Sequence, residues 1–446
     1  MTDVDLLILA ARAVTDHGEG PVAAGVRDGT IAYLGPTDGA PTAAAVVELG
    51  DDEVLMPGVV DTHVHVNDPG RTEWEGFASA TRAAAAGGVT TLIDMPLNSI
   101  PPTVDLAALR VKRETAHHQT WIDVGFWGGA VPGNVPQLAP LWTAGVFGFK
   151  CFLLHSGVDE FPALRPHEVE EAMRALAPLD GLLIVHAEDA GVIDHATAAH
   201  GRRYADFLAS RPRGAENLAI ATVIELARRT GCRVHVLHVS SSDALPMIAS
   251  ARRDGVRITA ETCPHYLTFS AEEIADGATT FKCCPPVREA GNRELLWEGL
   301  RDGTIGLVVS DHSPSTPELK HLDTGDFGTA WGGISSLQLG LSAVWTGARQ
   351  RGFDLTDVSR WMSQAPAAQV GLSRKGRIAV GQDADLCVFA PDETWVVDAA
   401  ALQHKNPITP YAGRTLTGAV RSTWLRGRRI DTRSRPEGRL LTRGEA

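Results

Sequence analysis

The sequence predicts an α/β protein with a (β/α)8 barrel of the TIM type and a small β-sandwich domain formed from the N- and C-terminal segments. Three observations support this fold class. Short apolar segments alternate with helical segments through the middle of the chain, as parallel β/α units require. Both ends of the chain carry short strands and turn residues instead. The length of 446 residues exceeds one ordinary domain and suits a barrel with one appended domain.

Residues 1–52 contain the first group of strand and turn signals. The apolar runs 6–9, 22–26 and 31–34 are typical of strands, and Asp28-Gly29 separates the last two runs. An Asp-Gly pair between apolar runs favours a tight hairpin. The segment therefore predicts a small β unit that precedes the main domain.

The segment 53–369 is predicted to form the barrel. A helix expected over Trp74–Ala86 ends at Gly87-Gly88, and the apolar strand Val89–Asp94 follows it. Further strands are expected at 124–127, 147–152, 182–186, 234–239, 258–261 and 307–310, with the clearest helices at 166–177 and 217–229. A doubly wound sheet is the alternative, but no Gly-rich phosphate loop supports it.

Residues 370–446 return to short strands and turns. Strands are expected within 381–389, 395–397 and 420–426, and Gly427 follows the last one. Because the two β-rich ends flank one barrel, the simplest arrangement pairs them in a single sandwich-like domain.

Composition and charge limit the possible functions. Hydrophobic residues make up 44% and charged residues 21%, as in a globular protein. The net charge of −13 comes without a basic block, which argues against nucleic-acid and membrane partners. The six cysteines are scattered, and the N-terminus lacks the basic segment of a signal peptide. With no apolar run of membrane-spanning length, the sequence predicts a cytoplasmic protein.

A His-x-His pair lies at the start of the predicted barrel. The apolar residues before it predict a buried strand, and His63 and His65 would leave the same face of that strand. Two imidazoles on one rigid strand end form half of a metal site. Taken alone, strand histidines with backbone partners explain the pair equally well, so other residues have to decide.

Ionisable residues also end several other predicted strands. In a barrel of this type the C-terminal strand ends meet around the active site. The residues that would meet there are His63, His65, Lys150, His186, His238 and Asp311. A single strand-end His or Asp is usually a cap or turn residue, but a ring of them is difficult to explain as core. The pattern therefore predicts a metal site.

Lys150 needs a separate explanation, because a buried ammonium beside metal cations would be repelled. Addition of CO2 to the neutral amine would give an anionic carbamate, whose two oxygens can bridge two metals. A lysine paired with a carboxylate is the alternative.

The pattern of His-x-His, lysine, two histidines and aspartate resembles the cyclic amidohydrolases of the amidohydrolase superfamily, and among them the allantoinases. The similarity covers nearly the whole chain and rests on the segments 67–76, 94–103, 148–161, 262–267, 282–288, 310–314, 330–336 and 404–411. The resemblance implies a barrel with a flanking β-sandwich, hydrolysis of allantoin to allantoate in purine catabolism, and a homotetramer.

The resemblance also implies a binuclear metal centre. Its ligands would be His63 and His65 for one ion, His186 and His238 for the other, carboxylated Lys150 as the bridge, and Asp311 on the first ion. Asp311 would also act as the general base. Zinc is the expected metal, with cobalt, nickel and manganese as alternatives, and CO2 is needed to modify the lysine. His235, three residues before His238, is expected to be structural.

Two departures from related enzymes narrow the substrate. Dihydroorotases usually carry Arg two residues after the second His of the pair, where this chain has Asn67, and an uncharged hydantoin ring needs no such cation. Hydantoinases commonly place a Tyr oxyanion donor five residues after the bridging lysine. His155 stands there in this chain, and its imidazole could donate a hydrogen bond or belong to a surface loop.

The candidate substrate contacts are Asn98, His155, Cys284 and Gly332. Cys284 and Gly332 occupy loop positions at which hydantoinases offer backbone groups to the cyclic amide. A nucleophilic role for Cys284 is the alternative, although the sequence assigns it no partner histidine. Cys151, beside Lys150, would point to the opposite strand face and into the core.

Other functions stay open at this point. The first is another cyclic amidohydrolase, either a hydantoinase (dihydropyrimidinase) or a dihydroorotase. The second is a non-catalytic scaffold on the same fold, although such proteins typically lack metal ligands and all six ligand positions are filled here. A mononuclear deaminase would not need the strand-end lysine.

Overall fold

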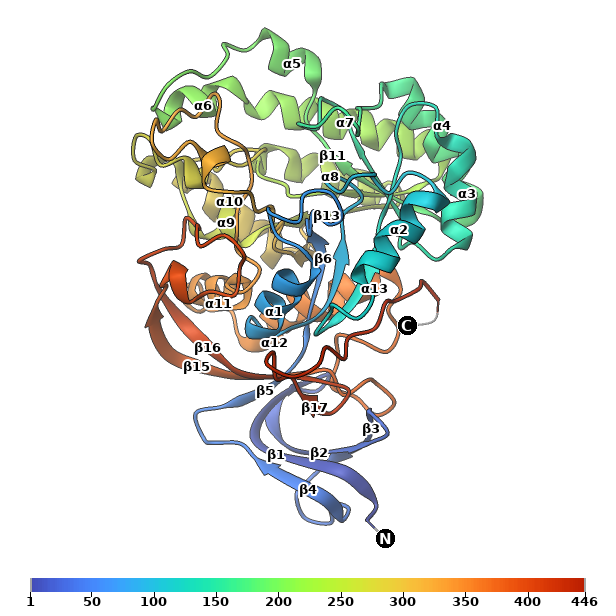
Figure 1. Ribbon diagram of the computed structural model, residues 1–446, viewed down its shortest axis with the longest axis vertical. Helices are drawn as coiled ribbons and strands as arrows, with labels where there is room; N and C mark the ends of the chain where they lie inside the picture. The colour runs from blue at the N-terminus through green and yellow to red at the C-terminus, as the bar shows by residue number, and fades with distance from the viewer. Residues whose placement is uncertain (1, 445–446) are drawn as a thin grey trace.

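A computed structural model describes residues 2–444 and confirms the predicted fold class (Figure 1). Parallel strands form the centre of the barrel, and the helices that follow them lie on its outside. The barrel strands are β6 (Val59–Val64), β7 (Val89–Asp94), β8 (Asp123–Phe126), β9 (Gly128–Gly129), β10 (Phe149–Phe152), β11 (Leu182–His186), β12 (Arg233–Val236), β13 (Ile258–Thr262) and β14 (Leu307–Val308).

The helices follow in chain order between and after these strands. They are α1 (Phe77–Ala86), α2 (Leu106–Ala116), α3 (Val135–Thr143), α4 (Pro166–Leu176), α5 (Ala190–His195), α6 (Tyr204–Ser210), α7 (Arg213–Thr230), α8 (Leu245–Arg253), α9 (Pro264–Thr268), α10 (Ala290–Arg301), α11 (Gly340–Arg349), α12 (Leu355–Ser359) and α13 (Ala365–Val370). Within residues 2–444, none of them combines the length and the apolar character that a membrane crossing demands.

Two sets of contacts close the strands into a ring. Strands β6 to β8 pair in parallel, and β9 to β14 form a second parallel run. Trp127 alone separates β8 from β9, and the Phe147 amide donates to the Phe126 carbonyl at 3.1 Å. On the other side the His65 amide donates to the His312 carbonyl at 2.8 Å, which joins the ends of β6 and β14. The closed parallel ring is the barrel that the alternation of strands and helices predicted.

Strands from both chain ends pair with one another, as predicted, and they form one sheet where the sequence predicted a sandwich-like domain. Their bounds are β1 (Val4–Thr15), β2 (Gly18–Arg27), β3 (Thr30–Gly35), β4 (Ala43–Glu48), β5 (Val54–Pro57), β15 (Leu386–Val396), β16 (Thr415–Leu425) and β17 (Arg428–Arg429). β5 lies between β1 and β15, so it joins the N-terminal strands to the C-terminal ones. The domain limits of 1–52 with 370–446, and of 53–369, stay a prediction.

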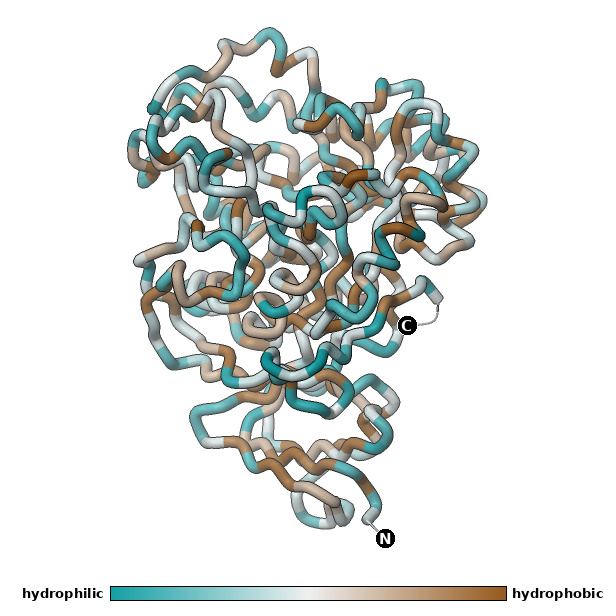
Figure 2. The backbone as a smooth tube through the Cα atoms, viewed as in Figure 1, coloured by the Kyte–Doolittle hydropathy of each residue, from teal (hydrophilic) through white to brown (hydrophobic). Residues whose placement is uncertain are grey.

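The predicted hairpin is present in this sheet. Asp28 and Gly29 connect β2 to β3 with φ values of 52° and 78°, the left-handed backbone that a tight hairpin turn needs. Hydrophobic residues lie along β1 and β2 (Figure 2). Buried side chains of these strands, such as Ile8 and Ala24, form a small hydrophobic core that is separate from the core of the barrel.

Two barrel strands end two or more residues earlier than predicted. β12 ends at Val236 instead of Val239, and β14 ends at Val308 instead of Ser310. His238 and Asp311 follow these ends with φ values of 35° and 44°, which no continuing strand adopts. Their positive φ values explain why each strand ends before the apolar run does.

A buried cluster of ion pairs lies where the terminal sheet meets the barrel. The Lys375 ammonium lies 2.8 Å from a carboxylate oxygen of Asp123 and 2.6 Å from one of Asp385. The Arg426 guanidinium lies 2.7 Å from Asp123, which ends up between two cations. Asp123 begins barrel strand β8, whereas Asp385 precedes β15, so the cluster joins the two parts of the molecule.

We expect Lys375→Met to lower the free energy of unfolding by about 3–5 kcal/mol, because it leaves two buried carboxylates without their shared cation. Urea unfolding followed by tryptophan fluorescence measures the change. Arg377→Met is the control, since Arg377 makes only a long surface ion pair with Asp16 at 3.4 Å. A Lys375 variant as stable as this control would contradict the role of the cluster.

Candidate metal centre

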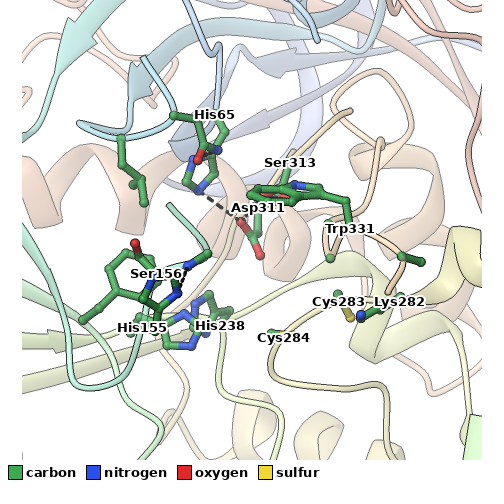
Figure 3. Close-up of a pocket in the computed structure, with 18 of the residues that line it drawn as sticks. His65, His155, Ser156, His238, Lys282, Cys283, Cys284, Asp311, Ser313 and Trp331 are labelled. Atoms are coloured by element: carbon green, nitrogen blue, oxygen red, sulfur yellow. Dashed lines mark hydrogen bonds and ion pairs between the residues drawn. The ribbon is translucent and has the colours of Figure 1, made fainter. Parts of the chain in front are cut away.

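A cavity of about 270 Å³ opens at the C-terminal end of the barrel strands. His65, His238 and Asp311 reach toward one space from separate segments, while Cys284 and Trp331 face it from loops (Figure 3). The cavity is also lined by Asn98, Lys150, His155, His186, Arg211, Lys282, Cys283, Ser313, Gly332 and Gly333. The mouth of a barrel is where this fold carries its active sites.

The His-x-His pair and the strand-end lysine converge, as the sequence predicted. His63 lies in β6 and His65 directly follows it, whereas Lys150 lies in β10. The Lys150 Nζ atom lies 3.4 Å from the Nε2 atom of His63 and 3.4 Å from that of His65. All three side chains are buried. The two imidazoles therefore present their Nε2 atoms to one amino group inside the barrel.

Asp311 completes this side of the centre. Its Oδ1 atom lies 3.1 Å from His63 Nε2 and 3.7 Å from His65 Nε2, and it accepts a 2.8 Å hydrogen bond from the Ser313 hydroxyl. The left-handed backbone at Asp311 costs free energy and turns the residue out of the strand direction. A short strand followed by this turn places the carboxylate against the histidine pair.

His186 and His238 form the opposite side. Their ring centroids lie 4.6 Å apart, and the His238 ring lies 5.4 Å from that of His63. Ligating atoms of His63, His238 and Asp311 all lie within 4.8 Å of one another. The six strand-end residues that the sequence singled out thus surround one small volume.

Burial and the charge of Lys150 make this cluster a metal-binding donor set. The pKa values of the four histidines lie well below their usual range, because burial disfavours the charged imidazole and Lys150 repels it. At neutral pH each imidazole is therefore uncharged and keeps a free lone pair. Neutral imidazoles with one carboxylate are ligands that zinc and similar divalent ions prefer.

Lys150 and Asp311 have pKa values close to neutrality. Burial lowers the pKa of Lys150 to about 8, with Asp311 and Glu261 opposing the change. Burial raises the pKa of Asp311 to about 7, and the charge of Lys150 opposes that change. Lys150 is therefore deprotonated in an appreciable fraction of molecules near neutral pH, which is the form that can react with CO2.

Two glutamates that sequence analysis missed orient the histidines. The Glu261 carboxylate lies 2.5 Å from His63 Nδ1 and, through its other oxygen, 2.8 Å from His235 Nε2. Nδ1 of His63 therefore holds the proton that Glu261 accepts, and its Nε2 faces Lys150 and Asp311. The sequence did offer one signal for Glu261, because this residue ends the predicted buried strand 258–261, as the other site residues end theirs. His235 supports Glu261, in agreement with its expected structural role.

The second glutamate is Glu188. Its Oε2 atom lies 2.9 Å from His186 Nε2 and accepts a hydrogen bond from Arg211 at 3.0 Å. Because Nε2 is occupied by the carboxylate, Nδ1 of His186 is the nitrogen left for a metal. Such outer carboxylates fix the tautomer and raise the basicity of metal-binding imidazoles.

The four candidate substrate contacts all line the cavity. Asn98, with φ of 64°, brings its amide nitrogen to 3.5 Å from His65 Nδ1. His155 is exposed, and its Nε2 atom lies 3.3 Å from Asp159. A Cβ atom placed on Gly332 would lie 3.5 Å from Cys284 Sγ, so these two residues are neighbours in the wall of the cavity.

The cysteines show no sign of nucleophilic activation. Burial raises the pKa of Cys284, which keeps its sulfur in the unreactive thiol form at neutral pH. Cys151 is completely buried in the main hydrophobic core, as predicted. Cys284 therefore presents no thiolate nucleophile to the cavity at neutral pH.

Comparison with known proteins agrees with this fold and donor set. The amidohydrolase family model matches residues 54–430, and the chain belongs to that family. Among solved structures, L-hydantoinase (dihydropyrimidinase) from Arthrobacter aurescens superposes with a TM-score of 0.91 at 30% sequence identity, over 99% of this chain and 100% of that one.

Curated relatives narrow the family further. An allantoinase from Streptomyces avermitilis is 60% identical over 99% of this chain and 100% of its own length. An allantoinase from Saccharomyces cerevisiae is 50% identical over 85% of this chain and 83% of its own. The resemblance to allantoinases that the sequence motifs indicated is confirmed.

We expect Glu261→Gln to weaken zinc binding about 10–100-fold, because the amide cannot hold His63 and His235 as the carboxylate does. Competition with a chromophoric chelator measures the affinity. Glu171→Gln on the exposed face of α4 is the matched control. Unchanged zinc affinity in the Glu261 variant would remove that residue from the metal centre.

Proposed function

We propose that this protein hydrolyses the cyclic amide of allantoin to give allantoate, as a metal-dependent allantoinase. The end-to-end match to a bacterial allantoinase at 60% identity is the observation that supports this substrate. The convergence of four neutral imidazoles, Lys150 and Asp311 at the barrel mouth supports hydrolysis by a metal centre.

We also propose that the centre holds two divalent ions per chain, with zinc as the first candidate and cobalt, nickel or manganese as alternatives. The proposed ligands are His63, His65, His186, His238, Asp311 and Lys150 in its carboxylated form. The amine lone pair of Lys150 adds to the carbon of CO2 and forms a C–N bond while one C=O π pair moves onto oxygen. The proton that the nitrogen loses passes to water. The carbamate then supplies the negative charge that the neutral imidazoles lack.

Bound divalent ions would polarise the ring carbonyl and supply an activated water at neutral pH. We propose that Asp311 takes a proton from that water and delivers it to the ring nitrogen that leaves. Cys284 and Gly332 line the cavity, and their backbone groups are proposed to bind the cyclic amide, with Asn98 and His155 as further contacts. The exposure of His155 suits a contact to the outer, ureido end of the substrate.

Hydantoin hydrolysis is the second candidate, and the close superposition on L-hydantoinase favours it over dihydroorotate hydrolysis. The deciding experiment measures the metal content of the purified protein and its turnover of allantoin, hydantoin and dihydroorotate. We expect about two metals per chain and a clear preference for allantoin. A preference for another ring would change the substrate, and no turnover after reconstitution with zinc and bicarbonate would favour a non-catalytic scaffold.

A homotetramer and a cytoplasmic location complete the proposal. The first rests on the resemblance to cyclic amidohydrolases, and the second on the sparse and scattered cysteines. Light scattering coupled to gel filtration tests the assembly, with a mass of four chains as the expected result.

We expect Asp311→Asn to lower kcat for allantoin by about 10²–10⁴-fold while the fold and most of the metal are retained, because the amide cannot accept the proton. Steady-state kinetics with metal analysis on the same sample measures both quantities. Asp323→Asn is the surface control from the neighbouring loop. Near-normal turnover of the Asp311 variant would exclude the proposed proton transfer.

Reactivation of the metal-free enzyme by zinc and CO2 is expected to accelerate about tenfold between pH 7 and pH 9 at constant dissolved CO2. The neutral amine is the reacting form, and it accumulates as the pH rises through the Lys150 pKa of about 8. Lys150→Ala is the control and should bind little metal, with partial recovery on addition of short carboxylates. A pH-independent rate in the wild-type protein would contradict carboxylation of Lys150.

A further inference from the structure

Lys320 is a buried lysine next to the cavity that the metal centre does not use. It ends a short helical turn, Glu318–Lys320, and only 3% of its surface is exposed. Its Nζ atom donates to three carbonyl oxygens: that of Gly333 at 2.5 Å, that of Trp331 at 3.0 Å and that of Lys282 at 3.4 Å. An ammonium has three N–H donors, so these three acceptors match its full capacity.

The three carbonyls belong to the two loops that carry the proposed backbone contacts to the cyclic amide. Lys282 lies just before Cys283 and Cys284, and Trp331 and Gly333 flank Gly332. All of these residues line the cavity, with Trp331 and Cys284 on the same side in Figure 3. One side chain therefore reaches both loops from behind.

Backbone hydrogen bonds add to the connection between these loops. The Gly333 amide donates to the Lys282 carbonyl at 2.8 Å, and the Trp331 amide donates to the Leu319 carbonyl at 2.7 Å. A Cβ atom on Gly333 would lie 2.2 Å from the Ser313 carbonyl oxygen, so this loop also presses against the segment of Asp311. Close packing therefore connects this loop to the segment that carries Asp311.

A buried cation with carbonyl partners is costly to keep. Burial lowers the pKa of Lys320 to about 7, and the nearby charge of Lys282 acts in the same direction. A methionine at this position would fill similar space without that cost, so packing alone does not explain a lysine with three carbonyl partners. Binding three carbonyls of two loops at one point is a task that an apolar side chain cannot perform.

We propose that Lys320 is a positioning residue that holds the 282–284 and 331–333 segments at the spacing at which their backbone groups bind the cyclic amide. The proposal rests on the function proposed above. Lys320 touches neither the metal ligands nor the substrate, and it acts through the two loops.

The test compares Lys320→Met, Lys320→Gln and the control Glu318→Gln in the metal-loaded enzyme. Glu318 lies in the same short turn and is exposed. For Lys320→Met we expect the KM for allantoin to rise about tenfold or more, because a lost hydrogen bond from a charged donor changes an equilibrium by at least that factor. Metal content should match the wild-type value and kcat should change less than threefold, about the scatter of a surface variant. Lys320→Gln keeps an N–H donor group and should give an intermediate KM.

Amide hydrogen exchange gives a readout that does not depend on activity. In Lys320→Met the amides of 282–284 and 328–333 should exchange about tenfold faster, while the barrel strands keep their protection. Unchanged KM and unchanged exchange in a folded variant would overturn the proposal. If Lys320→Met fails to fold, Lys320→Gln carries the same decision. If the wild-type protein leaves allantoin intact, the proposed function fails, and hydrogen exchange still decides the role of Lys320.

Discussion

The architecture of the site depends on one constraint. Several imidazole and amine nitrogens face one another in a buried volume, and Asp311 is the carboxylate that lies among them. The Lys150 amino group lies 3.4 Å from the Nε2 atoms of His63 and His65. The Asp311 carboxylate lies 3.1 Å from the first of these two nitrogens. The other carboxylates, Glu261 and Glu188, stand behind the imidazoles, where they turn the free ring nitrogens inward. The inward-facing lone pairs of the imidazoles lack a partner until a cation binds them. Metal binding is therefore coupled to the stability of the barrel mouth.

The fold separates the buried metal-binding group from the loops that are proposed to recognise the substrate ring. Strand ends carry the metal-binding donors, and their positions are set by the parallel ladder of the barrel. Loops carry the polar backbone that faces the cavity, and their positions depend on a few internal hydrogen bonds, several of them made by Lys320. The two systems meet where Gly333 packs against Ser313, two residues after Asp311. The loop proposed to bind the substrate and the segment of the proposed general base therefore share one contact.

Most of the fold and the ring of ionisable residues could be predicted from sequence, because both depend on local patterns. Alternating apolar and amphipathic segments identify β/α units, and His63 and His65 share a face through strand periodicity alone. Sequence analysis missed the glutamates behind the histidines for a physical reason. Glu261 acts on His63, which is almost 200 residues earlier in the chain, and no local pattern records such a pairing.

The errors in strand length have a related cause. His238 follows an apolar run that looks like continuing strand, but its positive φ ends the strand at Val236. Tertiary contacts determine that turn, since the Leu237 amide donates to the Val185 carbonyl and the Val239 amide to the Glu261 carbonyl on neighbouring strands. Lys320 was invisible for the same reason, because its three carbonyl partners are defined only in the folded loops.

The central place of β5 in the terminal sheet has a consequence for biosynthesis. Pro57 pairs with Leu386, about 330 residues later, so the ribosome completes the entire barrel before β5 receives its second neighbour. During that interval β5 exposes an unpaired edge, which is a template for contacts with other chains. A transcript cut short before β15 would yield a polypeptide with all the metal-binding residues and an open sheet. Protein quality control would therefore meet such truncated chains as aggregation-prone species, even though they contain every proposed metal ligand.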